Sequence, residues 1–148
     1  MIAALYVALT YVAAAFGLSS GVIQFRLSEV LCILPVFISP AVPGLFIGCF
    51  LANLLTGCAF WDVIFGSIAT LLGAIGTRLL RRNRYLASVP PIVSNMLIVP
   101  FVLQYVYGVE DSYLFLMATV GLGELVCAGI GGQLLYQVLW SRREMFEE

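Results

Sequence analysis

Apolar runs of membrane-crossing length follow one another along almost the whole chain. The first extends from Ile2 to Leu18, and similar runs recur as far as Trp140 with short polar breaks between them. A helix needs about 20 apolar residues to cross a hydrocarbon core about 30 Å thick. Charged residues make up only 10% of the 148 residues, against roughly 25% in a soluble domain. The sequence therefore predicts an all-α integral membrane protein.

Six transmembrane helices are predicted, and prolines set several of their ends. Ser39-Pro40 ends the second span because proline stops a helix, and Pro90-Pro91 opens the fifth. The last span is long enough to be tilted or to protrude. The predicted spans are residues 2–18, 27–39, 41–58, 62–80, 90–107 and 112–140, which form one compact domain over residues 1–148.

Positive charge is concentrated at two points of the sequence. All basic residues except Arg26 lie either in residues 78–84, after span four, or at Arg142-Arg143, after span six. Six spans place both termini on one side of the membrane, and the positive-inside rule assigns arginine-rich connections to the cytoplasm. The prediction is a multi-pass protein of the cell membrane with both termini cytoplasmic.

Several kinds of chemistry are excluded by the residues that the chain lacks. It contains no histidine and no lysine, so it can form neither a Ser-His-Asp device nor the lysine-containing loop that binds ATP. Its four cysteines are scattered through apolar segments without a CxxC pair, as expected of small buried side chains. We expect no catalytic residue, metal or cofactor. Transport would be passive, driven by an ion gradient, or driven by ATPase partners.

Small residues recur at four-residue spacing in two spans. Ala4 and Ala8 share one face of span one and leave it nearly flat. Gly44, Gly48 and Ala52 form a similar stripe on span three, which predicts close approach of another helix.

A polar stretch, Gln24 to Glu29, separates the first two spans. A charged group facing lipid costs about 2.5–3.5 kcal/mol, so this stretch must lie at the interface, line a cavity or pair internally. Arg26 and Glu29 either form an i,i+3 salt bridge or contact a ligand. The topology places the stretch at the outer face, where it is expected to be one edge of a ligand site.

Glu124 is the most deeply placed charge, about twelve residues into span six, or roughly 18 Å along a helix. Such a carboxylate needs a partner. The partner is a helix-bracing amide such as Asn53 or Asn95, a ligand, or a coupled proton. Gly121 and Gly123 beside it allow a backbone or a flat ligand to approach closely.

Other polar residues lie at or near the predicted outer ends of the spans, except Asn95, which lies within span five. Asn53 and Asn95 either brace helices or contact ligand, and Asp62 either caps span four or contacts ligand. Gln104 lies near the outer end of span five. Aromatic residues expected to anchor the chain at the interface are Trp61, Tyr105 and Tyr107.

Carboxylates, carboxamides and aromatic rings near one membrane face suit a flat, polar heterocycle with several N–H donors. A guanine-like edge would fit, although this residue set does not single it out. The candidate substrate-binding residues are Arg26, Glu29, Asn53, Asp62, Asn95, Gln104 and Glu124.

The chain resembles the substrate-binding S-components of energy-coupling-factor (ECF) vitamin transporters, and among them the queuosine-precursor transporter (QueT) family. The resemblance covers essentially the whole chain and six spans. The motifs that carry it are Ala4-x-x-x-Ala8, Gly21 to Glu29, Pro43 to Gly48 with Ala52-Asn53-Leu54, Trp61 to Gly66, and Ser94-Asn95 through Pro100-Phe101.

This resemblance implies a protein that binds a 7-deazaguanine precursor or salvage form of queuosine at its outer side. Its implied partners are membrane lipid, a transmembrane coupling subunit and two cytoplasmic ATPases, with no nucleic acid. Ala4 and Ala8 would be the docking surface for the coupling subunit. On our own hypothesis, Glu29 and Glu124 accept the donors of the heterocycle, and Arg26 positions Glu29 or closes the loop. The other edge of the heterocycle would be contacted by Asn53, Asn95 and Gln104.

Three alternatives remain at this stage. The protein could be an S-component for a different vitamin, which would share the same architecture. It could be a stand-alone carrier that uses Glu124 as a proton site. It could also be a small membrane assembly factor whose glycine and alanine stripes hold a partner, and this last class would bind no small molecule.

Overall fold

The computed structural model describes residues 1–17 and 25–146, and every regular element in this part of the chain is helical. The all-α prediction is confirmed for these residues. Gln24, which begins the predicted polar stretch, lies outside them, as do Leu18, Glu147 and Glu148.

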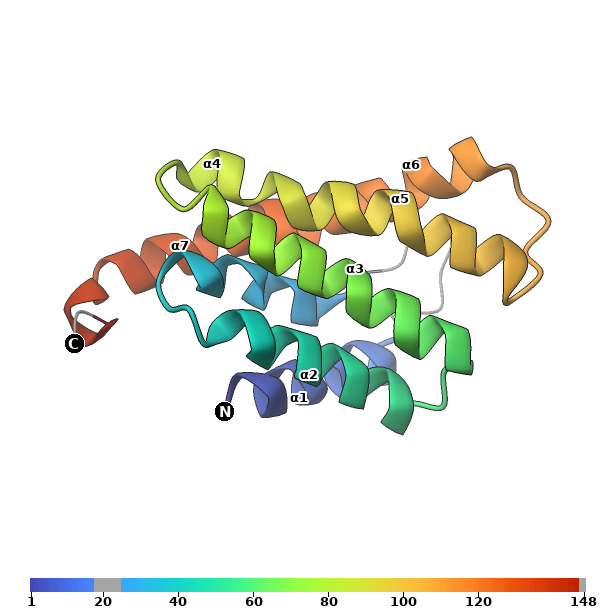
Figure 1. The fold of residues 1–148 in the computed structure, drawn as a ribbon, viewed down its shortest axis with the longest axis horizontal. Helices are drawn as coiled ribbons and strands as arrows, with labels where there is room; N and C mark the ends of the chain where they lie inside the picture. Colours follow the sequence, from blue (N-terminus) through green and yellow to red (C-terminus); the bar gives the residue numbers. More distant parts are fainter. Residues whose placement is uncertain (18–24, 147–148) are drawn as a thin grey trace.

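Figure 1 shows the helices as an elongated bundle with most axes running along its length. The elements are α1 (Ile2–Ala15), η1 (Leu27–Val36), α2 (Ala41–Leu55), α3 (Phe60–Leu79), α4 (Arg84–Ala87), α5 (Val89–Tyr105), α6 (Tyr113–Glu124), η2 (Leu125–Gly131), α7 (Gly132–Trp140) and η3 (Arg143–Phe146).

Three helical segments are long and apolar enough to cross a membrane by length and composition. They are Phe60–Leu79, Arg84–Tyr105 and Tyr113–Trp140, the last of which combines α6, η2 and α7. The other apolar helices, α1, η1 and α2, have 14, 10 and 15 residues. The chain is therefore a helical membrane protein by composition.

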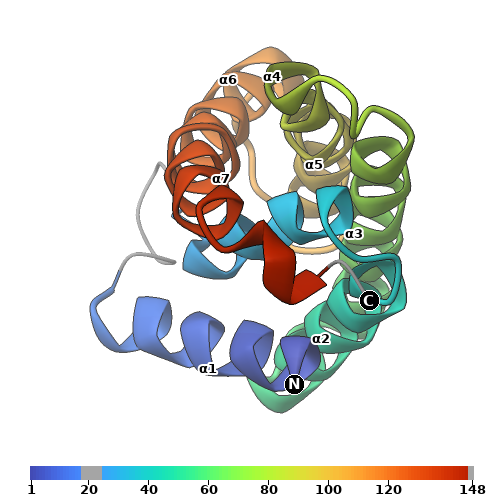
Figure 2. The same ribbon diagram turned by 90° about the vertical axis from the view of Figure 1, so that its left-hand side faces the viewer.

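The element that follows the polar stretch is a 3₁₀-helix, η1, which ends three residues before the predicted end of span two. It contains Pro35, which has no N–H to donate and so disfavours a regular α-helix. Figure 2, viewed along the bundle, shows η1 in light blue with α1, α3, α5 and α7 around it. Seven of its ten residues are buried, among them Ser28 and Glu29, so the polar beginning of η1 is carried into the interior.

The stripe of small residues on α2 packs against α1. A Cβ atom added to Gly48 would lie 2.7 Å from Tyr6 Cβ and 3.0 Å from Ala3 Cα, and one on Gly44 would lie 3.2 Å from Ile2 Cβ. Any larger side chain at Gly48 would push the two helices apart. The predicted close helix approach is confirmed.

Glycines also allow the other central contacts. A Cβ on Gly73 would lie 2.8 Å from the Cα of Pro91, so α3 and α5 lie backbone to backbone. A Cβ on Gly131, in the π-helical turn η2, would lie 2.8 Å from Val30 Cγ2 of η1. The glycine-rich part of the last helix therefore makes room for η1.

The two ends of the bundle differ in charge. One end, here called the basic end, carries the N-terminus, the end of α7 and the α3–α4 turn (Figure 1), and with them the arginines of residues 78–84 and 142–143. The opposite end, here called the acidic end, carries the α2–α3 and α5–α6 turns, with Asp62, Glu110 and Asp111.

Candidate functional site

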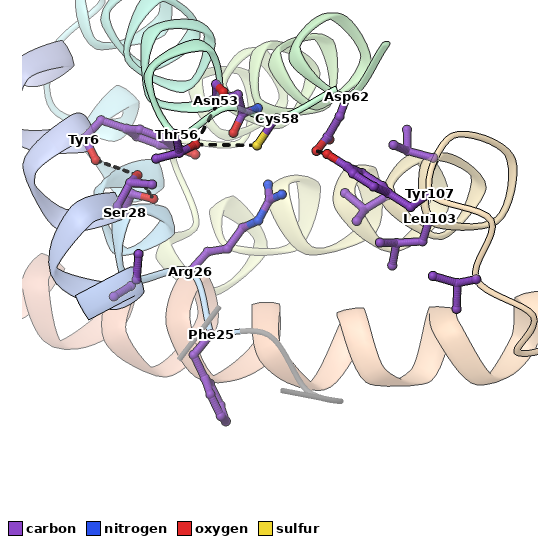
Figure 3. A pocket seen from close by; sticks show the side chains of 16 residues that line it. Tyr6, Phe25, Arg26, Ser28, Asn53, Thr56, Cys58, Asp62, Leu103 and Tyr107 are labelled. Carbon is purple, nitrogen blue, oxygen red and sulfur yellow. Dashed lines mark hydrogen bonds between the residues drawn. The ribbon is translucent and has the colours of Figure 1, made fainter. Parts of the chain in front are cut away.

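A cavity of about 510 Å³ opens toward the acidic end. It lies between the second half of α1, the residues that lead into η1, the α2–α3 turn and the end of α5 (Figure 3). Its lining residues are Tyr6, Thr10, Ala13, Ala14, Phe25, Arg26, Ser28, Asn53, Thr56, Cys58, Asp62, Val99, Val102, Leu103, Tyr107 and Val109.

Arg26 extends across this cavity, with its guanidinium toward the α2–α3 side, whereas the ring of Phe25 points away (Figure 3). The backbone of Arg26 is extended, with φ −97° and ψ 91°, and Arg26 is the N-cap residue of η1. Within the described residues Arg26 forms no salt bridge with Glu29, because the Glu29 carboxylate is turned toward α1 and η1. The predicted i,i+3 ion pair is therefore wrong, and the Arg26 guanidinium is available to the cavity.

Glu29 lies behind the cavity wall rather than on it. Its side chain is fully buried, and its two carboxylate oxygens accept hydrogen bonds from Tyr6 Oη at 2.7 Å and from Cys32 Sγ at 2.8 Å. Tyr6, which lines the cavity, separates Glu29 from it. As the protein stands, Glu29 positions Tyr6 and does not face the open space.

Asp62 is the carboxylate that faces the cavity. It accepts a hydrogen bond of 2.5 Å from Tyr107 Oη, which in turn accepts one of 3.2 Å from the Ala59 N–H. Partial burial and, second, this contact with Asp62 raise the pKa of the Tyr107 phenol, which keeps it a donor at neutral pH. The helix cap is Ala59, since α3 begins at Phe60. The alternative of Asp62 as helix cap is therefore wrong, and Asp62 and Tyr107 line the cavity together.

Asn53 faces the same cavity from α2. It is 7% exposed, and its Nδ2 lies 3.7 Å from Cys49 Sγ. A Cβ on Gly66 would come within 3.0 Å of this Nδ2 and 3.5 Å of Asp62 Oδ1, so glycine leaves room for both polar groups. Arg26, Asn53 and Asp62 are thus brought together around one space.

Two further predicted residues form a sealed polar centre deeper in the bundle. Asn95 is fully buried and donates from Nδ2 to Pro91 O at 2.9 Å, and its amide contacts the Glu124 carboxyl, which is 4% exposed. Asn95 is thus one of the two amides predicted to brace Glu124. Among the described residues, neither Asn95 Oδ1 nor Glu124 Oε2 has a hydrogen-bond partner. Neither residue lines the cavity.

Gln104 braces the outer turn instead of lining the cavity. Its Nε2 donates to the carbonyl oxygen of Asp111 at 2.9 Å, which links the end of α5 to the turn before α6. The candidate set is therefore divided: three members line the cavity, three lie behind it, and Gln104 holds a turn.

Comparison with known proteins decides the family. The family model described as "QueT transporter" matches residues 1–140. This chain belongs to the QueT transporter family. The resemblance inferred from the sequence is thereby confirmed.

One curated relative of the QueT family is the "Queuosine precursor transporter QueT" of Lactococcus lactis subsp. cremoris (strain MG1363). It is 39% identical over 72 residues, which are 49% of this chain and 42% of that relative. The match thus covers less than half of the relative's own length. No solved structure matches this QueT-family chain.

Sequence reasoning missed hydroxyl groups on the inner face of α1. Thr10 Oγ1 lies 2.8 Å from Tyr6 O and 3.2 Å from Ser28 Oγ of η1, so the hydroxyls of α1 and η1 form a pair beside the cavity. The available signal was the four-residue spacing of Tyr6 and Thr10 in an otherwise apolar helix, which places them on one face. Thr56, which caps the end of α2 and also lines the cavity, was missed as well.

Ala4 and Ala8 lie on the outer face of α1, and both are exposed. Tyr6 and Ala13 are the buried residues of the same helix. The flat alanine face is therefore available to a partner in this QueT-family protein, and its docking role remains a prediction. In the described part of the chain, no three His, Cys, Asp or Glu residues are grouped so that they could hold a metal ion.

Proposed function

We propose that this protein is the substrate-binding S-component of an ECF importer and takes up a 7-deazaguanine precursor or salvage form of queuosine. The observation that carries the proposal is the cavity at the acidic end, crossed by Arg26 and lined by Asn53 and Asp62. Its volume of about 510 Å³ lies within the roughly 300–1,000 Å³ typical of small-molecule sites. Family membership and the printed name of the Lactococcus relative support the substrate class.

The cavity offers complementary groups to a guanine-type edge. A carboxylate can accept two parallel N–H groups, which assigns the N–H edge of the heterocycle to Asp62. Arg26 donates to a ring carbonyl, and Asn53 provides both a donor and an acceptor. Apolar side chains such as Val102 and Leu103 would pack on the ring faces. Glu29 and Glu124 would contact ligand only after Tyr6 or Arg26 has moved.

The proposed topology has six spans, both termini in the cytoplasm, and the cavity open to the outside. Separation of the arginines at the basic end from the carboxylates at the acidic end supports this orientation through the positive-inside rule. A transmembrane coupling subunit would dock on Ala4 and Ala8, and two cytoplasmic ATPases would supply the energy.

Thermal unfolding of the purified protein with a ligand panel tests the substrate class, because only ligands that bind the folded state raise the melting temperature. We expect a shift with 7-deazaguanines and none with other vitamins. Asp62→Asn should weaken binding about 10-fold or more, while Glu110→Gln, on the outer turn, serves as the matched control. Glu29→Gln and Glu124→Gln test the deeper carboxylates as contacts. A shift with another vitamin alone would reassign the substrate.

Docking is tested by uptake with the coupling subunit and ATPases present. Ala8→Trp should abolish ATP-dependent uptake and leave ligand binding intact, because the bulky ring lies on the exposed face of α1. Leu72→Trp, on the exposed face of α3, is the control. Loss of binding in Ala8→Trp would instead indicate a folding role.

A second candidate function is proton-coupled transport without ATPases. The buried Glu124 Oε2, which lacks a hydrogen-bond partner among the described residues, favours it because such an oxygen can take up a proton. Uptake by the protein alone in vesicles with an imposed pH gradient would establish this function, and its loss in Glu124→Gln would identify the site.

A further inference from the structure

A second cavity of about 400 Å³ lies on the outer surface of the bundle, between α4–α5 and η2–α7. Both α4 and α7 lie toward the basic end (Figure 1). Apolar side chains such as Ile92, Leu125 and Leu134 form most of its walls, and Ser88, Gln133 and Tyr85 also line it. It is therefore an amphipathic groove, here called the α5–η2 groove.

Gly129 in the π-helical turn lies beside two apolar residues that line this groove. A Cβ atom there would lie 3.4 Å from Leu125 Cδ1 and 3.6 Å from Ile92 Cδ1, which are ordinary contact distances. Gly129 therefore lies between two apolar walls of the groove and adds no side chain of its own to the space between them. Leu125 and Gln137 bound the groove along the helix and are twelve residues apart, which corresponds to roughly 18 Å.

The polar part of the groove is tied to the arginine-rich turn. Gln133 Nε2 donates to Arg84 O and to Ser88 Oγ, each at 2.7 Å. The Arg84 guanidinium lies 4.6 Å from the ring centre of Tyr85 and donates to its Oη at 2.7 Å. Since arginine has five N–H donors, most of those of Arg84 remain available beside the groove.

Arg81 and Arg82 add two exposed positive charges in the turn that leads to Arg84. None of the three forms a salt bridge with a carboxylate among the described residues. Trp140, which is 48% exposed, stacks on Tyr136 at 5.6 Å on α7 near the same end, as expected of an aromatic side chain at a membrane interface. The apolar groove lies next to the Arg84 guanidinium, because Tyr85 lines the groove and contacts that guanidinium. An apolar groove beside a cation without a carboxylate partner among the described residues matches the charge of an anionic amphiphile.

We propose that the α5–η2 groove is a binding site for an anionic phospholipid. One acyl chain lies along Gly129, and the phosphate is held by Arg81, Arg82 and Arg84. The occupant is a lipid because the groove is apolar over most of its walls and Arg84, which contacts the groove residue Tyr85, would lie at the membrane edge, where basic pockets bind anionic headgroups. The inference rests on the proposed orientation, in which the basic end meets the cytoplasmic leaflet.

Native mass spectrometry of the purified full chain, released from micelles with added phosphatidylglycerol or phosphatidylcholine, tests the site. We expect one phosphatidylglycerol to be retained about 10-fold more than phosphatidylcholine. Arg81→Gln/Arg82→Gln should abolish most of this preference, because roughly fivefold per arginine for two arginines is enough to account for all of it. Arg142→Gln/Arg143→Gln removes the same charge from the other basic segment and should keep most of the preference.

Filling the α5–η2 groove at Gly129 provides an independent test. Gly129→Leu should lower retention of phosphatidylglycerol, and Gly129→Ala should have a smaller effect; thermal unfolding checks that both are folded. Equal retention of the two lipids by the wild type, or an unchanged preference in Arg81→Gln/Arg82→Gln, would overturn the proposal. So would a dimer mass with no bound lipid, which would make a second copy the occupant. Substrate binding is not read out, so failure here leaves the 7-deazaguanine proposal intact.

Discussion

The cavity wall and the sealed polar centre contain the same pair of chemical groups in opposite situations. At the cavity, Asp62 and Asn53 are each 7% exposed and Asp62 has a phenol donor. In the centre, Glu124 and Asn95 are 4% and 0% exposed, and each keeps one oxygen without a partner among the described residues. A carboxylate and an amide are therefore insufficient to define a ligand site, because accessibility depends on what lies between them and solvent.

Arg26 and Tyr6 separate the two regions. Arg26 lines the cavity and is electrostatically coupled to both Glu29 and Glu124, while Tyr6 lines it and donates to Glu29. These two side chains face the open space on one side and the sealed carboxylates on the other. Ligand could therefore reach the sealed polar centre only by displacing Arg26 or Tyr6.

The largest effect is expected from breaking the sealed side. Glu29→Leu removes the acceptor of both Tyr6 Oη and Cys32 Sγ, and an unpaired buried donor costs about 1–3 kcal/mol. We expect the free energy of unfolding to fall by about 2 kcal/mol, measured by thermal or chemical unfolding in detergent. Glu110→Leu, on an exposed turn, is the control. Equal stability of Glu29→Leu and wild type would show that the centre is not held by this network.

An intermediate effect is expected from breaking the boundary. Arg26→Met retains most of the length of the side chain but loses its donors. A hydrogen bond to a charged group contributes about 1.5–3 kcal/mol, so the Kd for the 7-deazaguanine should rise roughly 10- to 100-fold by calorimetry. Unfolding should change less than in Glu29→Leu. Arg82→Met is the control, because it makes the same substitution at the other end of the bundle. Unaltered affinity in Arg26→Met would remove Arg26 from the site.

The smallest effect is expected from a substitution that changes the cavity side alone. In Gly66→Ala the new methyl group lies 3.0 Å from Asn53 Nδ2, so the amide must shift by a few tenths of an ångström. Binding should weaken roughly two- to fivefold, while alanine in a helix interior should raise stability by up to about 1 kcal/mol. Gly129→Ala, at ordinary contact distances, should leave binding unchanged. Weaker binding with lower stability would instead indicate general overpacking.

Much of the fold could be predicted because its signals are local. The four-residue spacing of Gly44 and Gly48 is enough to predict close helix packing, and the helices are visible in the sequence as apolar segments. The 3₁₀ geometry of η1 and the π-turn η2 could not be predicted, since both depend on how neighbouring helices pack against Pro35 and Gly131.

The site was predicted only in part for a related reason. Arg26, Asn53 and Asp62 line the cavity as polar residues near span ends would suggest, whereas Glu29 lies behind Tyr6. Whether a polar side chain faces the cavity or lies behind its wall depends on the rotation of one helix relative to another. The sequence pattern does not contain this rotation. Thr10 was missed because its neighbours in the sequence are apolar.

The 3₁₀ winding of η1 also determines its mechanical length. At about 2.0 Å per residue its 10 residues extend roughly 20 Å, against roughly 15 Å for an α-helix. The helix η1 begins beside Arg26 at the cavity. Near its other end, the Pro35 carbonyl accepts a 3.0 Å hydrogen bond from Arg78. Pro35 has no N–H for an i→i+4 hydrogen bond, so η1 keeps this extra length of about 5 Å and holds Arg26 and the carbonyl bound by Arg78 that much farther apart.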